Sequence, residues 1–330
     1  MNKKIGLYFL LPALLLVQSC ETKKKTEEKP LRMVSVPAFN ADSAYNYVAK
    51  QVKFGPRVPN TPAHRMTAGY LIEQFKKFGA EVTEQDFEAT TWDNQKLKLK
   101  NIIASYNPME KKRIILASHW DTRPYADKDT EKKDAPFDGA NDGASGVGIL
   151  LEIARAIHHS KLPDVGVDII LFDGEDWGEK ENERSSVKLP DDQSWWCLGS
   201  QYWSKHKHTK NYSAYFGILL DMVGAKHAQF FREGVSLEYA PTIVEKVWNT
   251  AHRLGYTDYF VKTNVAGITD DHEFVNTLAK IPMIDIVHYE VGVGFFGDYH
   301  HSRKDNLSII SKETLGAVGN TLLNVVYYEE

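Results

Sequence analysis

The sequence predicts a three-layer α/β fold in which helices cover both faces of a central mixed sheet. Strand-like and helix-like segments alternate along the chain, which is typical of this fold class. Two strand-like runs, residues 165–172 and 215–222, are apolar almost throughout, the pattern of strands buried on both faces of a sheet. No internal repeat or break in composition marks a second domain. The chain of 330 residues, 42% of them hydrophobic, suffices for one such domain, which we expect over residues 39–330.

The expected domain begins with two helices. Asn40 or Asp42 can cap a helix that Gly55-Pro56 stops, and a second amphipathic helix is expected over residues 62–78. Further strands are expected over residues 81–87, 97–106, 113–118 and 281–288. Further helices are expected over residues 143–158, 199–206, 241–254 and 312–327, with a short one opening at 270–272. The polar stretch 178–194 has no periodicity and is expected to be a loop near the functional site.

The first 38 residues are expected to lie outside this domain. Residues 2–4 (NKK) are basic, and the apolar stretch 5–17 has signal-peptide length, shorter than the roughly 20 residues that cross a bilayer. The segment VQSC, ending at Cys20, resembles a bacterial lipoprotein box. We therefore expect a lipoprotein-type signal peptide at 1–19, lipid on Cys20 and a disordered tether at 20–38. An ordinary secretory signal, cleaved nearby, is the alternative.

The protein is then expected to be exported, to face the periplasm and to touch a bacterial membrane through its lipid alone. A formal net charge of -4 gives no reason to expect nucleic acid as a partner. Cys20 and Cys197 are the only cysteines. Because lipid on Cys20 would leave Cys197 without a disulfide partner, we expect Cys197 to be a buried, inert thiol.

Residue types that bind metals occur where the expected strands end. His119 and Asp121 follow one strand and, being two residues apart, should point to the same side. Taken alone, such a histidine is more often structural. Asp142 lies in the glycine-rich segment DGANDGASG, where it either binds a metal or merely caps the following helix.

The acidic segment after residues 165–172 is more informative. Glu175 and Asp176 lie side by side there, and adjacent carboxylates at a buried strand end cost stability unless a cation or proton compensates them. Asp221 ends the next apolar strand, and His301 lies in a loop after the last one. Carboxylate oxygen and neutral imidazole nitrogen are the ligands of hydrolytic zinc sites, and ligands bind at the carboxyl ends of strands in open α/β sheets. Together these segments predict a metal site.

Six motifs, in this order, resemble the superfamily of zinc aminopeptidases and glutaminyl cyclases: SHWDTRP, DGANDGASG, LFDGEDWG, LLDMVGA, TDDHEF and HHSRKDN. The likeness runs from about the first expected helix to the C-terminus, and it is nearest to the bacterial glutaminyl-peptide cyclases. The resemblance implies a zinc aminopeptidase-like fold and one Zn²⁺ per chain. The implied reaction converts the N-terminal glutamine of peptides and proteins to pyroglutamate and releases ammonia.

The resemblance also implies residue roles. The zinc ligands would be Asp142, Asp176 and His301. The catalytic residues would be Glu175 as general acid and base, with Asp221 and Asp271 in an acidic network beside it. Substrate would meet Trp177, Trp195, Trp196 and His300, of which Trp195 and Trp196 stand in an otherwise polar loop. The site would be supported from behind by His119, Asp121 and Asp270, and Trp203 is expected in the core.

Two departures from the family pattern bear on the site. The family often has Glu-Glu where this chain has Glu175-Asp176, and the shorter aspartate requires a small shift of the metal or the loop. His300 stands where the animal cyclases have a tryptophan, so one pocket wall differs.

Two other functions remain as alternatives. The nearest is a two-zinc aminopeptidase of the same fold, with the second zinc held by His119 and Asp221. A catalytically inactive relative that serves as a binding module is disfavoured, because every expected ligand position is filled by a residue able to bind zinc.

Overall fold

The computed structural model describes Met1 and residues 34–329. The predicted signal peptide beyond Met1, Cys20 and most of the predicted tether lie outside the described residues. Val34 and Val36, which the sequence analysis assigns to the tether, are half-buried and pack against the main core. Within the described residues, no helix combines the length and apolar character needed to span a membrane.

A six-stranded sheet in the order β1-β2-β4-β3-β5-β8 forms the centre of the domain. Its strands are β1 (Glu81–Thr90), β2 (Lys96–Tyr106), β3 (Arg113–His119), β4 (Gly166–Phe172), β5 (Phe216–Asp221) and β8 (Met283–Val287). Strands β4, β3, β5 and β8 run parallel, whereas β1 pairs with β2, and β2 with β4, in antiparallel register. The predicted mixed sheet is thus confirmed, and its four parallel strands share one carboxyl edge.

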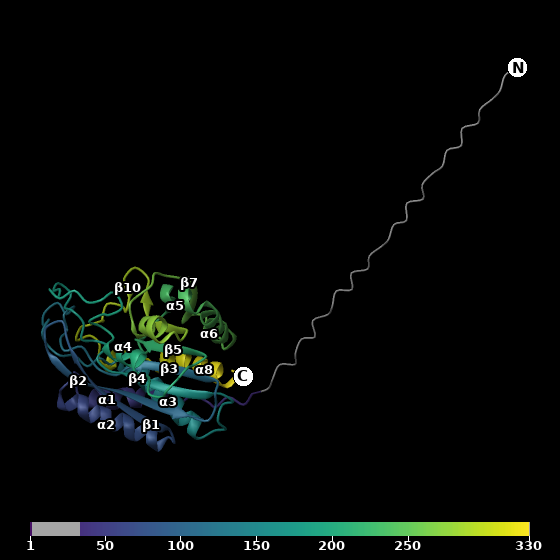
Figure 1. Cartoon of the computed structure of the whole chain (residues 1–330), viewed down its shortest axis with the longest axis horizontal. Coiled ribbons are helices and arrows are strands. Elements are labelled where there is room, and N and C mark those ends of the chain that lie inside the picture. The colour runs from purple at the N-terminus through teal and green to yellow at the C-terminus, as the bar shows by residue number, and fades with distance from the viewer. Residues whose placement is uncertain (2–33, 330) are drawn as a thin grey trace. The chain divides into compact units, whose positions relative to one another are not determined.

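Helices pack on both faces of this sheet (Figure 1). Along β3, Ile114 and Leu116 belong to the larger core, while Ile115 and Ala117 belong to a second core on the opposite face, as the alternation of a strand requires. The larger core is closed by α1 (Ala41–Lys53), α2 (Pro62–Lys77), α3 (Ala144–His158), α6 (Pro241–Arg253) and α8 (Lys312–Tyr327). The second core is closed by α4 (Leu198–Lys205) and a π-helical turn (Val275–Ala279). This confirms the three-layer prediction.

The N-terminal cap of α1 shows how local sequence and tertiary packing agree. The side chain of Asn40 accepts a hydrogen bond from the backbone N–H of Ser43 at 3.0 Å, the expected N-cap geometry. The backbone N–H of Asn40 donates to Oε1 of the buried Glu152 on α3, also at 3.0 Å. The cap therefore starts the helix and fixes it against its neighbour.

Several short elements have no counterpart in the sequence analysis. These are β6 (Phe230–Arg232), β7 (Phe260–Asn264), β9 (Tyr289–Glu290), β10 (Gly294–Phe295), α5 (Gly234–Tyr239) and a 3₁₀ turn (Leu307–Ile309). The short helix expected near residue 270 is α7 (Asp271–Phe274), capped by the side chain of Asp270.

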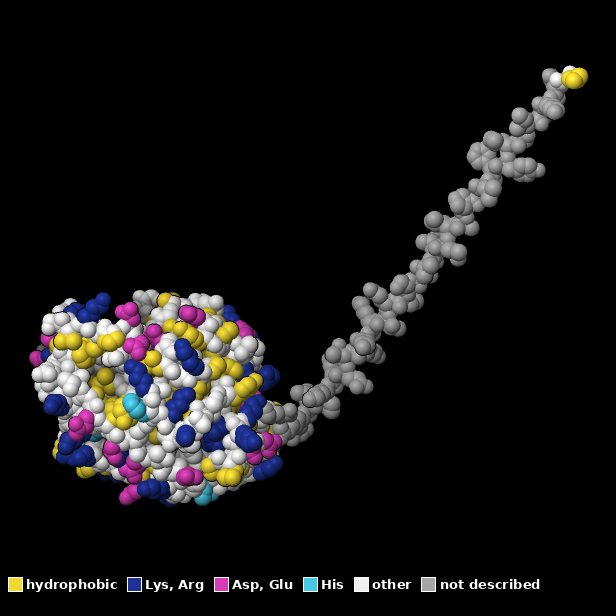
Figure 2. Space-filling view, viewed as in Figure 1, with side chains coloured by type: hydrophobic (Ala, Val, Ile, Leu, Met, Phe, Trp, Pro, Cys, Tyr) yellow, Lys and Arg dark blue, Asp and Glu magenta, His cyan; other side chains and the backbone are white. Residues whose placement is uncertain are grey.

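On the face seen in Figure 2, acidic and basic side chains are interspersed rather than segregated, in keeping with the small net charge.

Candidate metal centre and active site

The residues predicted to bind metal meet at the carboxyl edge of the parallel strands. His119 ends β3, Asp176 follows β4 and Asp221 ends β5. Asp142 lies in the turn before α3, and His301 lies in the loop between β10 and the 3₁₀ turn. Four connections far apart in the sequence thus deliver side chains to one place, as the strand ends predicted.

Asp142, Asp176 and His301 form a compact buried set. Nε2 of His301 lies 3.0 Å from Oδ1 of Asp176 and 3.7 Å from Oδ2 of Asp142. Those two carboxylate oxygens are buried and have no hydrogen-bond partner among the described residues. Buried acceptors without a donor are costly, and a cation removes that cost. Carboxylate oxygen and imidazole nitrogen are zinc ligands, so this donor set fits zinc.

His301 is in the form that binds a metal. Burial, followed by the positive charges of Arg123 and Lys128, lowers the pKa of His301 well below its ordinary value. The ring is therefore neutral, and its Nδ1 lies 3.7 Å from Oδ1 of Asp127, the usual place of a carboxylate behind a ligand histidine. His301 also has a left-handed φ of 52°, a conformation that costs a non-glycine residue about 1–3 kcal/mol and is concentrated at functional sites.

The surroundings of the Asp142 and Asp176 carboxylates disfavour their negative charge. Burial raises the pKa of Asp176 to about 7. Burial and then the neighbouring Asp176 raise the pKa of Asp142 as well. A bound dication would supply the missing positive charge.

Two buried carboxylates hold the ligand loops in place. Asp305 accepts hydrogen bonds from the backbone N–H groups of Asn141 and Asp142, at 2.7 and 3.0 Å. Asp121 accepts from the N–H groups of Glu175 at 3.1 Å and Asp176 at 3.2 Å, one on each oxygen. Asp121 is thus behind the site, as predicted, whereas Asp305 was missed although it lies inside the motif HHSRKDN.

His119 connects two of the acids. Its Nε2 lies 3.0 Å from Oδ1 of Asp142 and 3.3 Å from Oδ1 of Asp221. Burial acts to lower the pKa of His119, but hydrogen bonds with Asp121, Asp142 and Asp221 raise it well above its ordinary value. Ligand atoms of His119, Asp142 and Asp221 lie within 4.8 Å of one another, so this group is a second place where a metal could bind.

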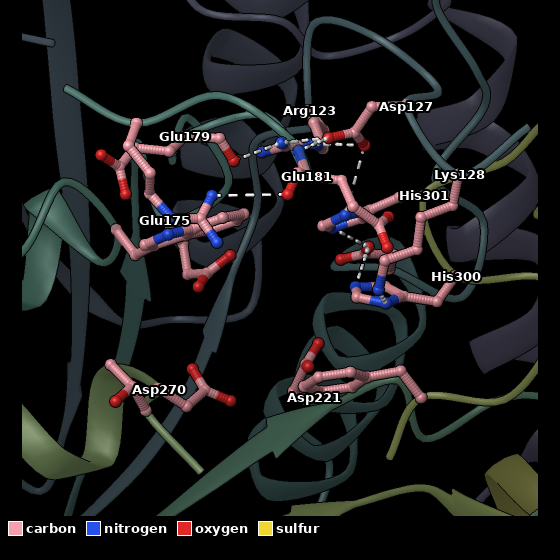
Figure 3. A pocket seen from close by; sticks show the side chains of 15 residues that line it. Arg123, Asp127, Lys128, Glu175, Glu179, Glu181, Asp221, Asp270, His300 and His301 are labelled. Atoms are coloured by element: carbon pink, nitrogen blue, oxygen red, sulfur yellow. Dashed lines mark hydrogen bonds and ion pairs between the residues drawn. The ribbon is translucent and has the colours of Figure 1, made fainter. Parts of the chain in front are cut away.

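A cavity of about 490 Å³ opens onto this centre (Figure 3). Figure 3 shows Asp221 and Asp270 on one side of it and Arg123 and Asp127 on the other. The cavity is lined by Arg123, Asp127, Lys128, Asp142, Glu175, Glu179, Glu181, Arg184, Trp196, Asp221, Thr269, Asp270, Phe296, His300 and His301.

Glu175 reaches this cavity with a side chain that is 14% exposed. Burial, and then the carboxylates of Asp270, Asp176 and Asp271, raise the pKa of Glu175 well above its ordinary value, against an opposing effect of His119. The thiol of Cys197 donates a hydrogen bond to Oε1 of Glu175 at 3.3 Å. Cys197 is buried, as predicted, but it contacts the expected base and is not a distant core residue.

The two acids at the start of α7 lie differently relative to the cavity, although both act on the pKa of Glu175. Asp270, expected behind the site, lines the cavity, and atoms of Asp270, Glu175 and Cys197 lie within 4.8 Å of one another. Asp271, expected beside the base, is fully buried and does not line the cavity. Neighbouring residues at a helix start point in different directions, which the motif alone does not resolve.

Of the three tryptophans predicted to contact substrate, only Trp196 lines the cavity. Its ring stacks on His301 at 5.9 Å, and the guanidinium of Arg123 lies 4.7 Å from the ring centre. Trp177 instead packs beside a small separate core, and Trp195 lines another surface hollow. The structure therefore does not bring Trp177 or Trp195 to the wall of this cavity. Trp203 is in the core, as predicted.

His300 lines the cavity as predicted, and its Nδ1 lies 2.7 Å from Nζ of Lys128. Its ring also packs on Phe296, with ring centres 4.4 Å apart. Arg123, Lys128 and Phe296 were missed by the sequence analysis. Arg123 belongs to the motif SHWDTRP, but only the fold shows that its buried guanidinium donates to Asp127 and to the backbone oxygen of Asp176.

The fold and this site together define an α/β protein of the zinc exopeptidase class, with a candidate metal centre at the carboxyl edge of its sheet. The profile of Peptidase family M28 matches residues 101–326, more than half of the chain. The chain belongs to peptidase family M28.

Solved structures of similar chains carry two kinds of description. A Zn-dependent exopeptidase from Parabacteroides distasonis is 50% identical, with a TM-score of 0.85 over 89% of this chain and 100% of that chain. A glutaminyl cyclase from Bacteroides thetaiotaomicron, bound to N-acetylhistamine, is 49% identical, with a TM-score of 0.86 over 90% of this chain and 100% of that chain.

The curated relatives are more distant. A glutaminyl-peptide cyclotransferase from Drosophila melanogaster is 22% identical over 282 residues, which are 78% of this chain and 73% of that protein. Coverage is uneven, since the chain spans only 31% of the length of an Escherichia coli relative that is 36% identical over 110 residues.

Proposed function

We propose that this chain is a zinc-dependent glutaminyl-peptide cyclotransferase, which converts N-terminal glutamine of peptides and proteins to pyroglutamate and releases ammonia. The observation that carries the proposal is the placement of Glu175. It faces the cavity next to the ligand Asp176, and Asp121 holds the backbone of both residues. A proton-transfer group and a candidate metal centre thus lie side by side at the same cavity.

The chain's own residues supply most of the chemistry. Zinc at Asp142, Asp176 and His301 would supply a Lewis acid for the side-chain amide carbonyl. Glu175 accepts a proton from the substrate α-amine as the amine nitrogen bonds to the amide carbon. Glu175 then gives that proton to the departing nitrogen, which leaves as ammonia, so the base is regenerated.

The cavity explains why a flexible side chain would cyclise here. Its volume of about 490 Å³ is large enough to admit a glutamine residue, and its polar and aromatic walls can orient the folded side chain. Trp196, Phe296 and His300 form aromatic walls, while Asp221 and Asp270 stand on the opposite side from Arg123. Holding amine and carbonyl together converts chain flexibility into reactivity, which is a proximity effect.

A two-zinc aminopeptidase is the second candidate. It is favoured by the approach of His119, Asp142 and Asp221 within 4.8 Å, and by the exopeptidase description of a structure 50% identical to this chain. Against it, Nε2 of His119 already lies at hydrogen-bonding distance from both acids. A second metal bound to Nε2 of His119 would have to displace the proton through which Nε2 bonds to these acids. We therefore propose one functional zinc per chain.

The deciding experiment offers Gln-peptides and Leu-peptides to the purified protein and measures ammonia and free amino acids. The cyclase releases ammonia from the Gln-peptide alone, at one zinc per chain. Release of free N-terminal residues, stimulated by a second equivalent of zinc, would replace the cyclase with the aminopeptidase.

We also propose that the enzyme is exported and attached to a bacterial membrane through lipid on Cys20. This rests on the sequence VQSC at residues 17–20, which lies outside the described residues. Cys20→Ser should release the protein from the membrane fraction without lowering its activity. Wild-type protein that incorporates no labelled fatty acid and fractionates as soluble would contradict the lipid anchor.

A further inference from the structure

Behind the cavity lies a second, fully buried group that the proposed mechanism does not use. It consists of Asp270 and His272 at α7 and Asp285 on β8, with ligand-type atoms within 4.8 Å of one another. Asp285 and His272 are completely buried, and Asp270 is 4% exposed. Because Asp270 also lies within 4.8 Å of Glu175 and Cys197, it connects the cavity with this interior group.

The interior group contains acceptors without donors. Both carboxylate oxygens of Asp285, Oδ2 of Asp270 and Nδ1 of His272 are buried and have no hydrogen-bond partner among the described residues. The other oxygen of Asp270 accepts from the backbone N–H of Asp271 at 2.5 Å. Two ionised carboxylates in such surroundings would be far costlier than one ionised and one neutral.

Glu233 provides a direct contrast within the same region. It is also fully buried, yet it accepts hydrogen bonds from the N–H groups of Val235, Ser236 and Ile268 and from the hydroxyl of Ser236, and it meets Nε2 of His272 at 3.1 Å. Burial acts to raise its pKa, but the contact with His272 and the other donors lower the pKa of Glu233 to about 2. Glu233 is therefore ionised, and its negative charge is stabilised by its own hydrogen-bond donors. It adds a negative charge near Asp285 and no donor to it.

Apart from His272, which lies within 4.8 Å, the groups that act most strongly on Asp285 are acidic. They are Asp270 at the start of α7, Asp221 at the end of β5 and Glu233 before α5. Burial, followed by Asp270, Asp221 and Glu233, raises the pKa of Asp285 well above its ordinary value. Its backbone N–H is already used, since it donates to Oγ of Ser236 at 2.9 Å.

We propose that Asp285 is kept as a neutral carboxylic acid that donates a hydrogen bond to Asp270, and that it is thereby a positioning residue for the Asp270 carboxylate at the cavity. No covalent step is involved: one proton stays on Asp285 and satisfies an acceptor of Asp270. The kinetic consequence rests on the proposed function. The protonation state itself does not.

The first test measures stability against pH for zinc-loaded Asp285→Asn and wild type. Above its ordinary pKa of about 3.9, the carboxyl group of Asp285 is ionised in the unfolded chain but keeps its proton in the folded protein. Folding then has to take up a proton, and the free-energy cost of this uptake grows with pH. An amide donates without this cost. The midpoint of unfolding of Asp285→Asn minus that of wild type should therefore increase steadily from about pH 5 to pH 8.

Asp168→Asn is the matched control, because Asp168 is equally buried but forms a two-point ion pair with Arg113, at 2.6 and 2.7 Å. It should lower the midpoint at every pH in that range. In the infrared difference spectrum of wild type minus Asp285→Asn, a carbonyl band of one neutral carboxylic acid should be present. An Asp285→Asn protein that loses a metal equivalent, or whose midpoint falls further at high pH, would show an ionised or metal-bound Asp285 and overturn the proposal.

The second test is kinetic. Asp285→Leu removes the hydrogen bond to Asp270 and should lower kcat on a Gln-peptide roughly 10- to 100-fold, because the Asp270 carboxylate is no longer held in position. Asp285→Asn still donates a hydrogen bond and should keep most of the wild-type kcat. Equal kcat in the Leu and Asn proteins would overturn the positioning role. If Asp285→Leu does not fold, the pH dependence of Asp285→Asn still decides. Wild-type protein without any ammonia release would refute the proposed function, while the stability and infrared measurements would still judge Asp285.

Discussion

Replacing Glu175 by glutamine tests the proposed mechanism most directly. The change keeps the shape of the side chain and leaves the backbone N–H bonded to Asp121. It removes only the capacity to carry a proton, which is worth about 10²–10⁴ in rate, or about 2.7–5.4 kcal/mol of barrier. Since Asp270 lines the same cavity within 4.8 Å of Glu175, it offers a substitute acceptor. We therefore expect a loss of rate near 10²-fold for Glu175→Gln alone and near 10⁴-fold for the double variant Glu175→Gln/Asp270→Asn.

The assay is ammonia release from a Gln-peptide, with zinc content measured on the same samples. Zinc should stay at one equivalent, because Glu175 is not in the ligand set. Glu181→Gln is the control, since Glu181 also lines the cavity but is exposed, and it should stay within about twofold. A Glu175→Gln enzyme that turns over at nearly the wild-type rate would remove Glu175 from the mechanism. Loss of zinc would instead make it a ligand.

Three further predictions concern the ligands, the pocket wall and the substrate amine. Asp176→Ala or His301→Ala should each lose zinc, whereas His119→Ala should keep it; the reverse pattern by metal analysis would overturn the ligand set. Trp196→Ala should raise KM roughly 10-fold, while the adjacent Trp195→Ala leaves KM unchanged, and equal effects would mean that stacking on His301 is not the cause. Activity should rise toward about pH 8, because the substrate amine, with a pKa of about 7.7–8.0, must lose its proton to attack; a rate that falls over this range contradicts an attacking amine.

The sequence was sufficient for the sheet because its central strands are unambiguous. A strand buried on both faces, such as β4, is apolar almost throughout, with the ion-paired Asp168 as its one charged residue, and a short apolar run between turn signals is typical of such a strand. The site followed from the same logic, since Asp176 and Asp221 come at the ends of those strands and therefore share an edge. Short elements such as β6 and β7 escaped detection because a few residues cannot establish a period.

The sequence could not decide which member of an adjacent pair faces the cavity. In Asp270-Asp271 and Trp195-Trp196 the residue types are the same, and only the local backbone direction separates a cavity wall from a buried or remote position. The partners of Asp285 were equally hidden, because β8 and α7 meet only in the folded chain. The roles assigned to these residues stay predictions until the substitutions are made.

Asp121 gives the site a coupling that reaches beyond stability. One carboxylate accepts from the N–H groups of Glu175 and Asp176, so the proposed proton carrier and the proposed metal ligand share a single anchor on two successive peptide units. A displacement of Asp121 would therefore act on the backbone of both residues together, and substitutions in the outer loop of the cavity that spare Asp121 leave this shared contact in place.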